Sequence, residues 1–251
     1  MKKILDVSYS SVSEKCKLDM YLPDTESFSV IIYFHGGGLE SGDKAGRHYL
    51  TMAERFVEHG YAFVSVGYRL YPDGAHCPDY LNDAADAIAF IKQHLQDSTA
   101  KILIAGQSAG AWMTLLLCLD SRYLEKVHIS PSSIDGWIID SAQTTSHFNV
   151  LKYDQGIDPR TQRIDEYAPL YHISEQTAFT KMLLLYYEDD MPCREEQNML
   201  LVKTILRFNP SANLKYYRLP GGHCNGSTRK DEDGEYRFVK ETIKWLKEEG
   251  F

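Results

Sequence analysis

Residues 101–119 read KILIAGQSAGAWMTLLLCL and join three pieces of predicted structure. The apolar run Ile102–Ala105 has the character of a buried strand, and Ala109–Leu119 has that of a helix. Between them stands Gly106-Gln107-Ser108-Ala109-Gly110, the G-x-S-x-G pattern of a nucleophile elbow, a turn so tight that small residues must flank the serine. A glycine and serine turn that only caps a helix is the alternative, but the flanking strand and helix favour the elbow. We therefore predict that Ser108 is a nucleophile raised above a sheet.

A second glycine motif, His35-Gly36-Gly37-Gly38, directly follows the apolar run Val30–Phe34. Consecutive glycines leave backbone N–H groups uncovered, which an oxyanion hole requires. We predict that the amides of Gly37, Gly38 and Ala109 form such a hole. A flexible glycine loop is one alternative, and a phosphate-binding loop is another, although the G-K-[ST] ending of a P-loop is absent. Two motifs in the right order, each after a strand, favour the oxyanion hole.

Short apolar runs alternate with helix-like stretches, which indicates βαβ units and a mostly parallel sheet with helices on both faces. The predicted strands are Val30–Phe34, Ala62–Tyr68, Lys101–Ala105, Gly136–Ile139, Met182–Tyr187 and Leu214–Leu219. The predicted helices are Tyr49–His59, Tyr80–Gln96, Ala109–Leu119, Arg194–Phe208 and Tyr236–Glu249. Ahead of these, Lys3–Tyr9 and Lys15–Leu22 are expected to form an antiparallel hairpin at one edge. On the second helix, Asp83, Asp86 and Lys92 are expected to face solvent.

The segment Gln143–Phe179 interrupts this alternation. It is long, polar and contains tyrosines, and an insertion of that length inside a domain is usually functional. We expect a lid or a substrate wall there, with His147 and His172 among its wall residues. Because no repeat, low-complexity tract or linker is present, we expect residues 1–251 to form a single domain that carries this cap-like insertion.

Charge and cysteine usage limit the classes of partner and compartment. A net charge of −8 and the lack of a basic stripe argue against a nucleic-acid partner. Five scattered cysteines without C-x-x-C spacing indicate free thiols in a reducing compartment. The N-terminus lacks the apolar stretch of a signal peptide, and no run approaches the roughly 20 apolar residues of a membrane span. We therefore expect a cytoplasmic protein with no membrane partner.

Three motifs together resemble the HGGG-bearing esterases of the α/β-hydrolase superfamily. They are Tyr33-Phe34-His35-Gly36-Gly37-Gly38, Gly67-Tyr68-Arg69-Leu70-Tyr71-Pro72 and Gly106-Gln107-Ser108-Ala109-Gly110. This group includes hormone-sensitive-lipase-like esterases, feruloyl and acetyl esterases, and kynurenine formamidases. The resemblance runs from about residue 20 to the C-terminus and implies an α/β-hydrolase fold. One departure is Leu39, which stands where an aromatic residue is common, so we expect the acyl pocket to differ there.

The resemblance also implies the other members of a catalytic triad. In this superfamily the order along the chain is serine, acid, histidine, and the acid follows the strand after the insertion. Counting from Leu183 favours Asp190, with Asp189 and then Glu188 as alternatives, since all three lie in one acidic turn. The histidine is His223, which follows a strand and a glycine-rich loop. Three of the remaining histidines are expected to be surface residues of helices: His59, His94 and His128.

These features predict a serine carboxylesterase that cleaves small carboxylic esters through an acyl-serine intermediate. No cofactor is implied, and no cluster of histidine, cysteine and aspartate has metal spacing. An amidase of the kynurenine formamidase type is the main alternative, and a peptidase is another. A binding protein that has lost catalysis on the same fold is the alternative from outside the enzymes, although serine, acid and histidine are all available here. The acyl group, the alcohol and the oligomeric state stay open at this point.

Overall fold

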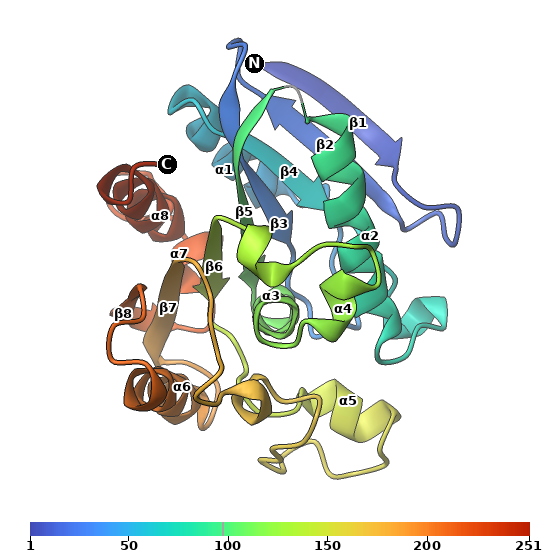
Figure 1. Ribbon diagram of the computed structural model, residues 1–251, viewed down its shortest axis with the longest axis vertical. Helices are drawn as coiled ribbons and strands as arrows, with labels where there is room; N and C mark the ends of the chain where they lie inside the picture. The colour runs from blue at the N-terminus through green and yellow to red at the C-terminus, as the bar shows by residue number, and fades with distance from the viewer. Residues whose placement is uncertain (97) are drawn as a thin grey trace.

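The apolar runs form one eight-stranded sheet with helices on both faces, in a computed structural model that describes residues 1–96 and 98–251 (Figure 1). The strands are β1 (Lys2–Ser8), β2 (Lys17–Leu22), β3 (Phe28–Phe34), β4 (Ala62–Val66), β5 (Thr99–Gln107), β6 (Gly136–Asp140), β7 (Met182–Asp189) and β8 (Leu214–Gly222). The helices are α1 (Arg47–Glu58), α2 (Asp79–His94), α3 (Ala109–Leu119), α4 (Arg122–Glu125), α5 (Phe148–Tyr153), α6 (Arg194–Phe208), α7 (Asn225–Thr228) and α8 (Arg237–Glu248). Short 3-10 turns are η1 (Tyr71–Asp73), η2 (Pro131–Ser133) and η3 (Pro169–His172).

The strand order is β1-β2-β4-β3-β5-β6-β7-β8. The pairs β1–β2 and β2–β4 are antiparallel, and every later pair from β4–β3 to β7–β8 is parallel. The predicted edge hairpin and the mostly parallel sheet are therefore both confirmed. The short helices α4, α5 and α7 were not predicted, because four to six residues carry too little periodicity to be recognised.

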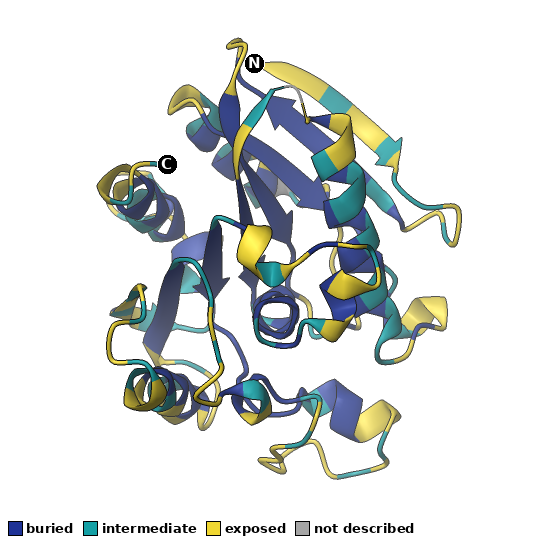
Figure 2. Ribbon diagram, in the orientation of Figure 1, coloured by how far each residue is buried: buried dark blue, intermediate teal, exposed yellow. Residues whose placement is uncertain are grey.

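Alternate residues of the central strand β3 face two different helix layers, because successive side chains of a strand point to opposite faces. Val30, Ile32 and Phe34 pack in the core that contains α2, α3 and α6, whereas Ile31 and Tyr33 pack in the core that contains α1 and α8. All residues of β3 are buried, as a strand covered on both faces requires. Figure 2 shows that the neighbouring parallel strand β4 is also buried throughout, whereas β5 is buried only from Ile102 onward.

The expectation that Asp83 faces solvent is wrong. Asp83 is only 2% exposed and accepts hydrogen bonds from the Arg69 guanidinium at 2.7–3.2 Å and from the Arg69 backbone N–H at 3.0 Å. The helix periodicity placed Asp83 on the polar side because it takes no account of a partner fourteen residues away. The pair anchors the segment after β4 to α2, so a charged side chain is buried where an opposite charge meets it.

Strand register brings the predicted motifs to one edge of the sheet. Phe34 is paired with Gly106, so the glycine loop after β3 and the turn after β5 begin side by side. Asp189 is paired with Gly222, so the loops after β7 and β8 begin together as well. The carboxyl ends of parallel strands are where ligands bind in open α/β sheets. The fold therefore collects all the candidate residues in one region.

Neither a long apolar helix nor a disulfide occurs in the described part of the chain. No helix there is both long enough and apolar enough to cross a membrane. The five cysteines are free thiols: Cys16, Cys77, Cys118, Cys193 and Cys224.

Candidate active site

Ser108 lies between the last residue of β5 and the first residue of α3, with a backbone φ of 53°. Its N–H donates to the carbonyl oxygen of Asp140 at 2.8 Å, which holds the turn against β6. The flanking glycines are required by space. A Cβ on Gly106 would lie 2.2 Å from the carbonyl oxygen of Gly110, and a Cβ on Gly110 would lie 2.1 Å from that of Phe34. The predicted elbow geometry is present.

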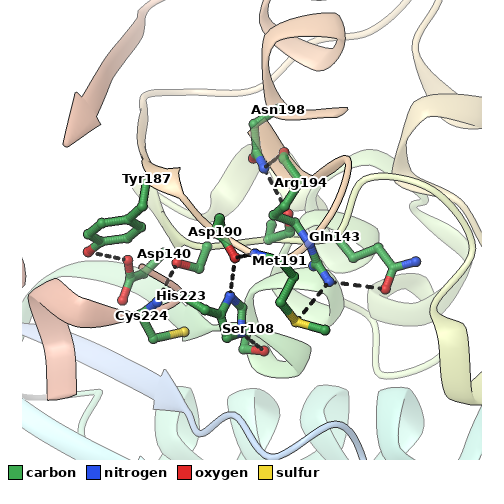
Figure 3. Close-up of polar contacts among 12 residues, drawn as sticks. Ser108, Asp140, Gln143, Tyr187, Asp190, Met191, Arg194, Asn198, His223 and Cys224 are labelled. Atoms are coloured by element: carbon green, nitrogen blue, oxygen red, sulfur yellow. Dashed lines mark hydrogen bonds and ion pairs between the residues drawn. The ribbon is translucent and has the colours of Figure 1, made fainter. Parts of the chain in front are cut away.

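A chain of hydrogen bonds joins Ser108, His223 and Asp190 (Figure 3). Ser108 Oγ lies 2.8 Å from His223 Nε2, and His223 Nδ1 lies 2.5 Å from Asp190 Oδ1. The side chain of His223 is 27% exposed and that of Asp190 only 1%. The arrangement can move a proton from the serine to the imidazole while a buried carboxylate faces the far ring nitrogen.

Of the three acidic candidates, Asp190 is the one that meets His223. Asp190 Oδ1 also accepts a hydrogen bond from the backbone N–H of Met191 at 2.6 Å, which orients the carboxylate. Asp189 and Glu188 are exposed, and Glu188 pairs with Arg218. Because consecutive side chains at the end of a strand point in opposite directions, only one of the two aspartates can face the imidazole.

The glycine loop after β3 presents two backbone amides to the same region. Gly37 and Gly38 adopt positive φ values of 118° and 65°. Within the described chain neither amide donates a hydrogen bond to another residue. The amide of Ala109 is the first of α3 and has no intrahelical acceptor. Gly37 and Gly38 line the same cavity as Ser108, and Ala109 directly follows Ser108 in the chain, so the three predicted donors come from adjacent parts of the structure.

His35 supports this loop from inside the core. Its ring stacks on Tyr68 with the centroids 4.4 Å apart, and its Nδ1 lies 2.7 Å from the carbonyl oxygen of Gly36. The Tyr68 hydroxyl donates to the carbonyl oxygen of His35 at 2.6 Å. Burial lowers the pKa of His35 to about 4, so the ring is neutral at neutral pH. The tyrosine of the Gly67–Pro72 motif therefore lies directly under the glycine loop.

A cavity of about 530 Å³ opens over Ser108 and His223. Its wall includes the glycine loop, Phe148 and Met191. The volume falls within the range of about 300–1,000 Å³ typical of small-molecule sites. Leu39 is fully buried in the core and is absent from this wall, so the expected effect of Leu39 on the acyl pocket is not seen.

The segment Gln143–Phe179 contributes to the site through α5, which lies along the lower edge of Figure 1. Phe148 lines the cavity, and Asn149 donates its side-chain amide to the carbonyl oxygen of Gly38 at 2.6 Å. Nothing in the local sequence singles out Asn149, because its partner lies 111 residues earlier in the chain. Asn149 is thus a residue of the site that the sequence analysis missed.

The two histidines expected to line the wall do not do so. His147 is 1% exposed, and its Nδ1 accepts a hydrogen bond from the backbone N–H of Asn149, so it caps α5. His172 borders a different depression and lies 2.9 Å from the carbonyl oxygen of Glu166. The three histidines expected at the surface, His59, His94 and His128, are exposed.

A buried carboxylate under the site was also missed. Asp140 accepts hydrogen bonds from the hydroxyl groups of Tyr187 at 2.9 Å and Ser227 at 2.6 Å. Gln107, next to Ser108, donates to the same Ser227 hydroxyl at 2.7 Å. Burial raises the pKa of Asp140 to about 6. An aspartate at the carboxyl end of a buried strand was the signal that could have identified it.

Among the residues that the structure describes, no group of three or more histidine, cysteine or carboxylate side chains is placed to hold a metal ion.

The family follows from a match between residues 18–152, more than half of the chain, and the BD-FAE family model. The chain belongs to the BD-FAE family. This is an esterase family with the α/β-hydrolase fold, which confirms the resemblance drawn from the three motifs. The matched span includes the glycine loop and the elbow of the BD-FAE domain.

Curated relatives agree with the BD-FAE assignment. The chain is 33% identical to the esterase LipI of Mycobacterium tuberculosis over 103 residues, which are 40% of this chain and 32% of LipI. It is 32% identical to the kynurenine formamidase of Danio rerio over 118 residues, 45% of this chain and 38% of that enzyme. It is 36% identical to the quorum-quenching protein AidA of Acinetobacter baumannii over 141 residues, 53% and 45% of the two chains. The matches span less than half the length of each relative.

Solved structures share the BD-FAE chain's fold over nearly its whole length. The esterase Est2 of Thermogutta terrifontis with bound propionate superposes with a TM-score of 0.78 at 20% identity, covering 100% of this chain and 94% of Est2. Esterase B of Lactobacillus rhamnosis gives a TM-score of 0.77 at 15% identity, covering 99% and 85%. The predicted α/β-hydrolase fold is confirmed.

Proposed function

We propose that this protein is a serine carboxylesterase that cleaves small carboxylic esters. The observation that carries the proposal is the hydrogen-bond chain from Ser108 Oγ through His223 to Asp190, at 2.8 and 2.5 Å. Membership of an esterase family is consistent with it.

The proposed reaction has two acyl-transfer steps. His223 Nε2 accepts the proton of Ser108 as the serine oxygen attacks the ester carbonyl. The carbonyl oxygen becomes an oxyanion that accepts hydrogen bonds from the amides of Gly37, Gly38 and Ala109. The C–O bond then breaks, and His223 gives the proton to the departing alcohol. Water, deprotonated by His223, then attacks the acyl-serine. The bond between Ser108 Oγ and the acyl carbon breaks, His223 returns the proton to Oγ, and the carboxylic acid leaves.

Asp190 acts through His223 and does not touch the substrate. Its carboxylate accepts the Nδ1–H, which leaves Nε2 free to accept the serine proton. The buried side chain also stabilises the positive charge that forms on the imidazole. These roles are supported by the hydrogen bond from the backbone of Met191, which orients Asp190.

We also propose that residues 143–179 serve as the substrate wall of a single hydrolase domain. Phe148 in the cavity and the bond from Asn149 to the glycine loop support this role. We further propose a cytoplasmic location, supported by the five free thiols.

Labelling with a fluorophosphonate probe tests the proposed nucleophile. The probe should form a covalent adduct on the tryptic peptide that contains Ser108, and Ser108→Ala should abolish both the adduct and turnover of 4-nitrophenyl acetate. Removing a triad nucleophile typically lowers turnover on the order of a millionfold. A Ser108→Ala protein that kept a tenth of the wild-type rate would overturn the assignment.

Hydrolysis of a formyl amide is the second candidate, because kynurenine formamidases of two fishes are among the relatives. The same hydrogen-bond chain can attack an amide carbonyl. Turnover of N-formylkynurenine, measured beside that of 4-nitrophenyl acetate, separates the two functions. A higher kcat/KM for the amide would assign the protein to the amidases.

A further inference from the structure

Arg194, the first residue of α6, is buried without an acidic partner. It is only 4% exposed, and no carboxylate oxygen of the described residues lies within ion-pair distance of its guanidinium. Its Nη2 makes one long hydrogen bond to Gln143 Oε1 at 3.5 Å and contacts Met191 Sδ at 3.8 Å. Its Nε has no hydrogen-bond partner in the described chain. A guanidinium has five N–H donors, so most of its donor capacity is unused.

Gln143 is a weak hydrogen-bond acceptor for the guanidinium of Arg194. The amide nitrogen of Gln143 donates to Thr145 Oγ1 at 3.1 Å and to the carbonyl oxygen of Ser146 at 2.8 Å. Its amide oxygen is thereby turned toward Arg194, but that oxygen also accepts from the backbone N–H of Phe148 at 3.3 Å. A neutral, shared acceptor at the limit of hydrogen-bond distance is a weak partner for a buried cation.

Burial lowers the pKa of Arg194, and the charge of Asp190 opposes that effect. One explanation for the buried position of Arg194 is therefore that its positive charge only balances the negative charge of Asp190 at a distance. That explanation does not account for the unused donors, since a guanidinium selected to balance Asp190 would be expected to contact it. Asp190 Oδ2 itself has no hydrogen-bond partner in the described chain.

Arg194 lines a cavity of about 280 Å³ that adjoins the cavity of Ser108. Phe148 and Met191 belong to the walls of both cavities, so these two side chains form the partition between them. Figure 3 shows Met191 between the Ser108–His223 pair and the guanidinium of Arg194. The second cavity is also bordered by the side chains of Gln162 and Gln197. Its lining is mostly apolar, and its two cationic side chains are Arg194 and Arg160, of which Arg160 is exposed and pairs with Asp158.

We propose that the cavity of Arg194 binds a carboxylate of the substrate, so that the enzyme prefers esters that carry a negative charge. This inference rests on the proposed esterase function and names its substrate class. The geometry of a carboxylate matches that of the planar guanidinium, and its two oxygens can accept hydrogen bonds from two of the unused N–H groups. A protein of net charge −8 repels anions at long range, so attraction of a carboxylate must come from a local site such as this one.

Two pairs of matched esters test the preference and show which part of the substrate carries the charge. The first pair compares 4-nitrophenyl hydrogen glutarate with 4-nitrophenyl pentanoate, so the carboxylate lies on the acyl side. The second pair compares 4-acetoxybenzoate with its methyl ester, so the carboxylate lies on the alcohol side. In one of the pairs, kcat/KM should favour the charged ester by at least about tenfold, the size of a charge-assisted hydrogen bond. No preference in either pair would overturn the proposal.

Arg194→Gln should remove that preference chiefly through a higher KM for the charged ester, while the neutral ester changes by less than about threefold. If Arg194 only balances Asp190, kcat for both esters should fall by the same factor, which would also overturn the proposal. Arg218→Gln is the matched control, because it removes the same charge from an exposed arginine that pairs with Glu188 and Glu195. The control should keep the wild-type preference.

Binding of glutarate provides a readout that does not depend on turnover. Calorimetry should detect glutarate but not the neutral glutaramide with the wild-type protein. Glutarate binding should weaken at least about tenfold in Arg194→Lys, which keeps the charge but loses the planar fork, and this variant serves if Arg194→Gln does not fold. Glutarate binding without any ester turnover would overturn the esterase function and support the subsite. Turnover of neutral esters with no glutarate binding would overturn the subsite alone.

Discussion

Asn149 donates its side-chain amide to the carbonyl oxygen of Gly38 at 2.6 Å, so a residue of α5 holds the loop whose two amides have no acceptor among the described residues. The contact joins the segment between β6 and β7 to the loop after β3. It gives that segment a role in positioning the proposed oxyanion hole, in addition to lining the cavity.

Asn149→Ala should lower kcat for 4-nitrophenyl acetate by about tenfold with little change in KM. The loss should be smaller than the hundredfold to thousandfold that follows from removing an oxyanion donor itself, because Asn149 only positions the loop. Asn213→Ala, which removes an exposed asparagine bonded to Glu249, is the control and should leave kcat unchanged. A rise in KM at unchanged kcat would mean that Asn149 acts in substrate binding instead.

Replacing each of the two neighbouring aspartates with asparagine should have very different effects. Asp190→Asn should lower kcat by about ten-thousandfold, since an amide in place of the carboxylate favours the wrong tautomer of His223. Asp189→Asn should change kcat by less than about twofold, because its side chain is exposed. Steady-state kinetics on one ester suffice. The reverse ranking would move the acid by one residue, and two mild variants would place it elsewhere in the chain.

The buried His35 should make stability depend on pH in the acid range. Its folded-state pKa of about 4 lies below the usual value of 6.5, so the unfolded chain binds a proton that the native state excludes. The contribution of His35 is thus fully present above pH 6.5 and is lost as the pH falls toward 4. Between pH 7 and pH 5, wild type should lose about 2 kcal/mol more unfolding free energy than His35→Gln does.

Urea unfolding of both proteins at several pH values measures this difference. The comparison is made between variants because buried Asp140, with its pKa raised to about 6, contributes in the opposite direction over part of the same range. His94→Gln, which changes an exposed histidine at the end of α2, is the control and should behave as wild type. Parallel stability curves for wild type and His35→Gln would show that the ring is protonated in the native state.

Short acyl chains should be the preferred neutral substrates. Phe148 and Met191 lie between the cavity of about 530 Å³ over Ser108 and the neighbouring cavity, so we expect these side chains to limit the length of the acyl chain. A series of 4-nitrophenyl esters from acetate to laurate gives the dependence of kcat/KM on length. An optimum at laurate, or a jump in rate above the micellar threshold, would contradict this prediction.

The parts of the fold and site that could be predicted from the sequence are those whose signals are local. The elbow around Ser108 and the loop of Gly37 and Gly38 each lie within a few residues of a strand end, so spacing alone located them. Asp190 required a count along β7, and the register of Asp189 with Gly222 shows why the count places it near His223. The local sequence motifs were thus sufficient to predict the main residues of the site.

The missed or misplaced residues depend on partners far along the chain. Asp83 is buried because Arg69 forms hydrogen bonds with its carboxylate. Asn149 belongs to the site because its side-chain amide donates a hydrogen bond to Gly38. Arg194 is buried beside a segment more than fifty residues earlier. Helix periodicity reports a preference for water or core, but it carries no information about such pairings, so it placed Asp83 on the wrong side and left the other two unremarked.

The φ of 53° at Ser108 has a thermodynamic consequence for the whole protein. Residues other than glycine held in such regions typically carry about 1–3 kcal/mol of strain, which the rest of the fold must offset. Ser108→Gly should therefore unfold at a higher temperature than wild type, even though it lacks the nucleophile. Selection for stability alone would replace Ser108. Its presence marks a position where the requirement for activity and the requirement for thermodynamic stability oppose each other.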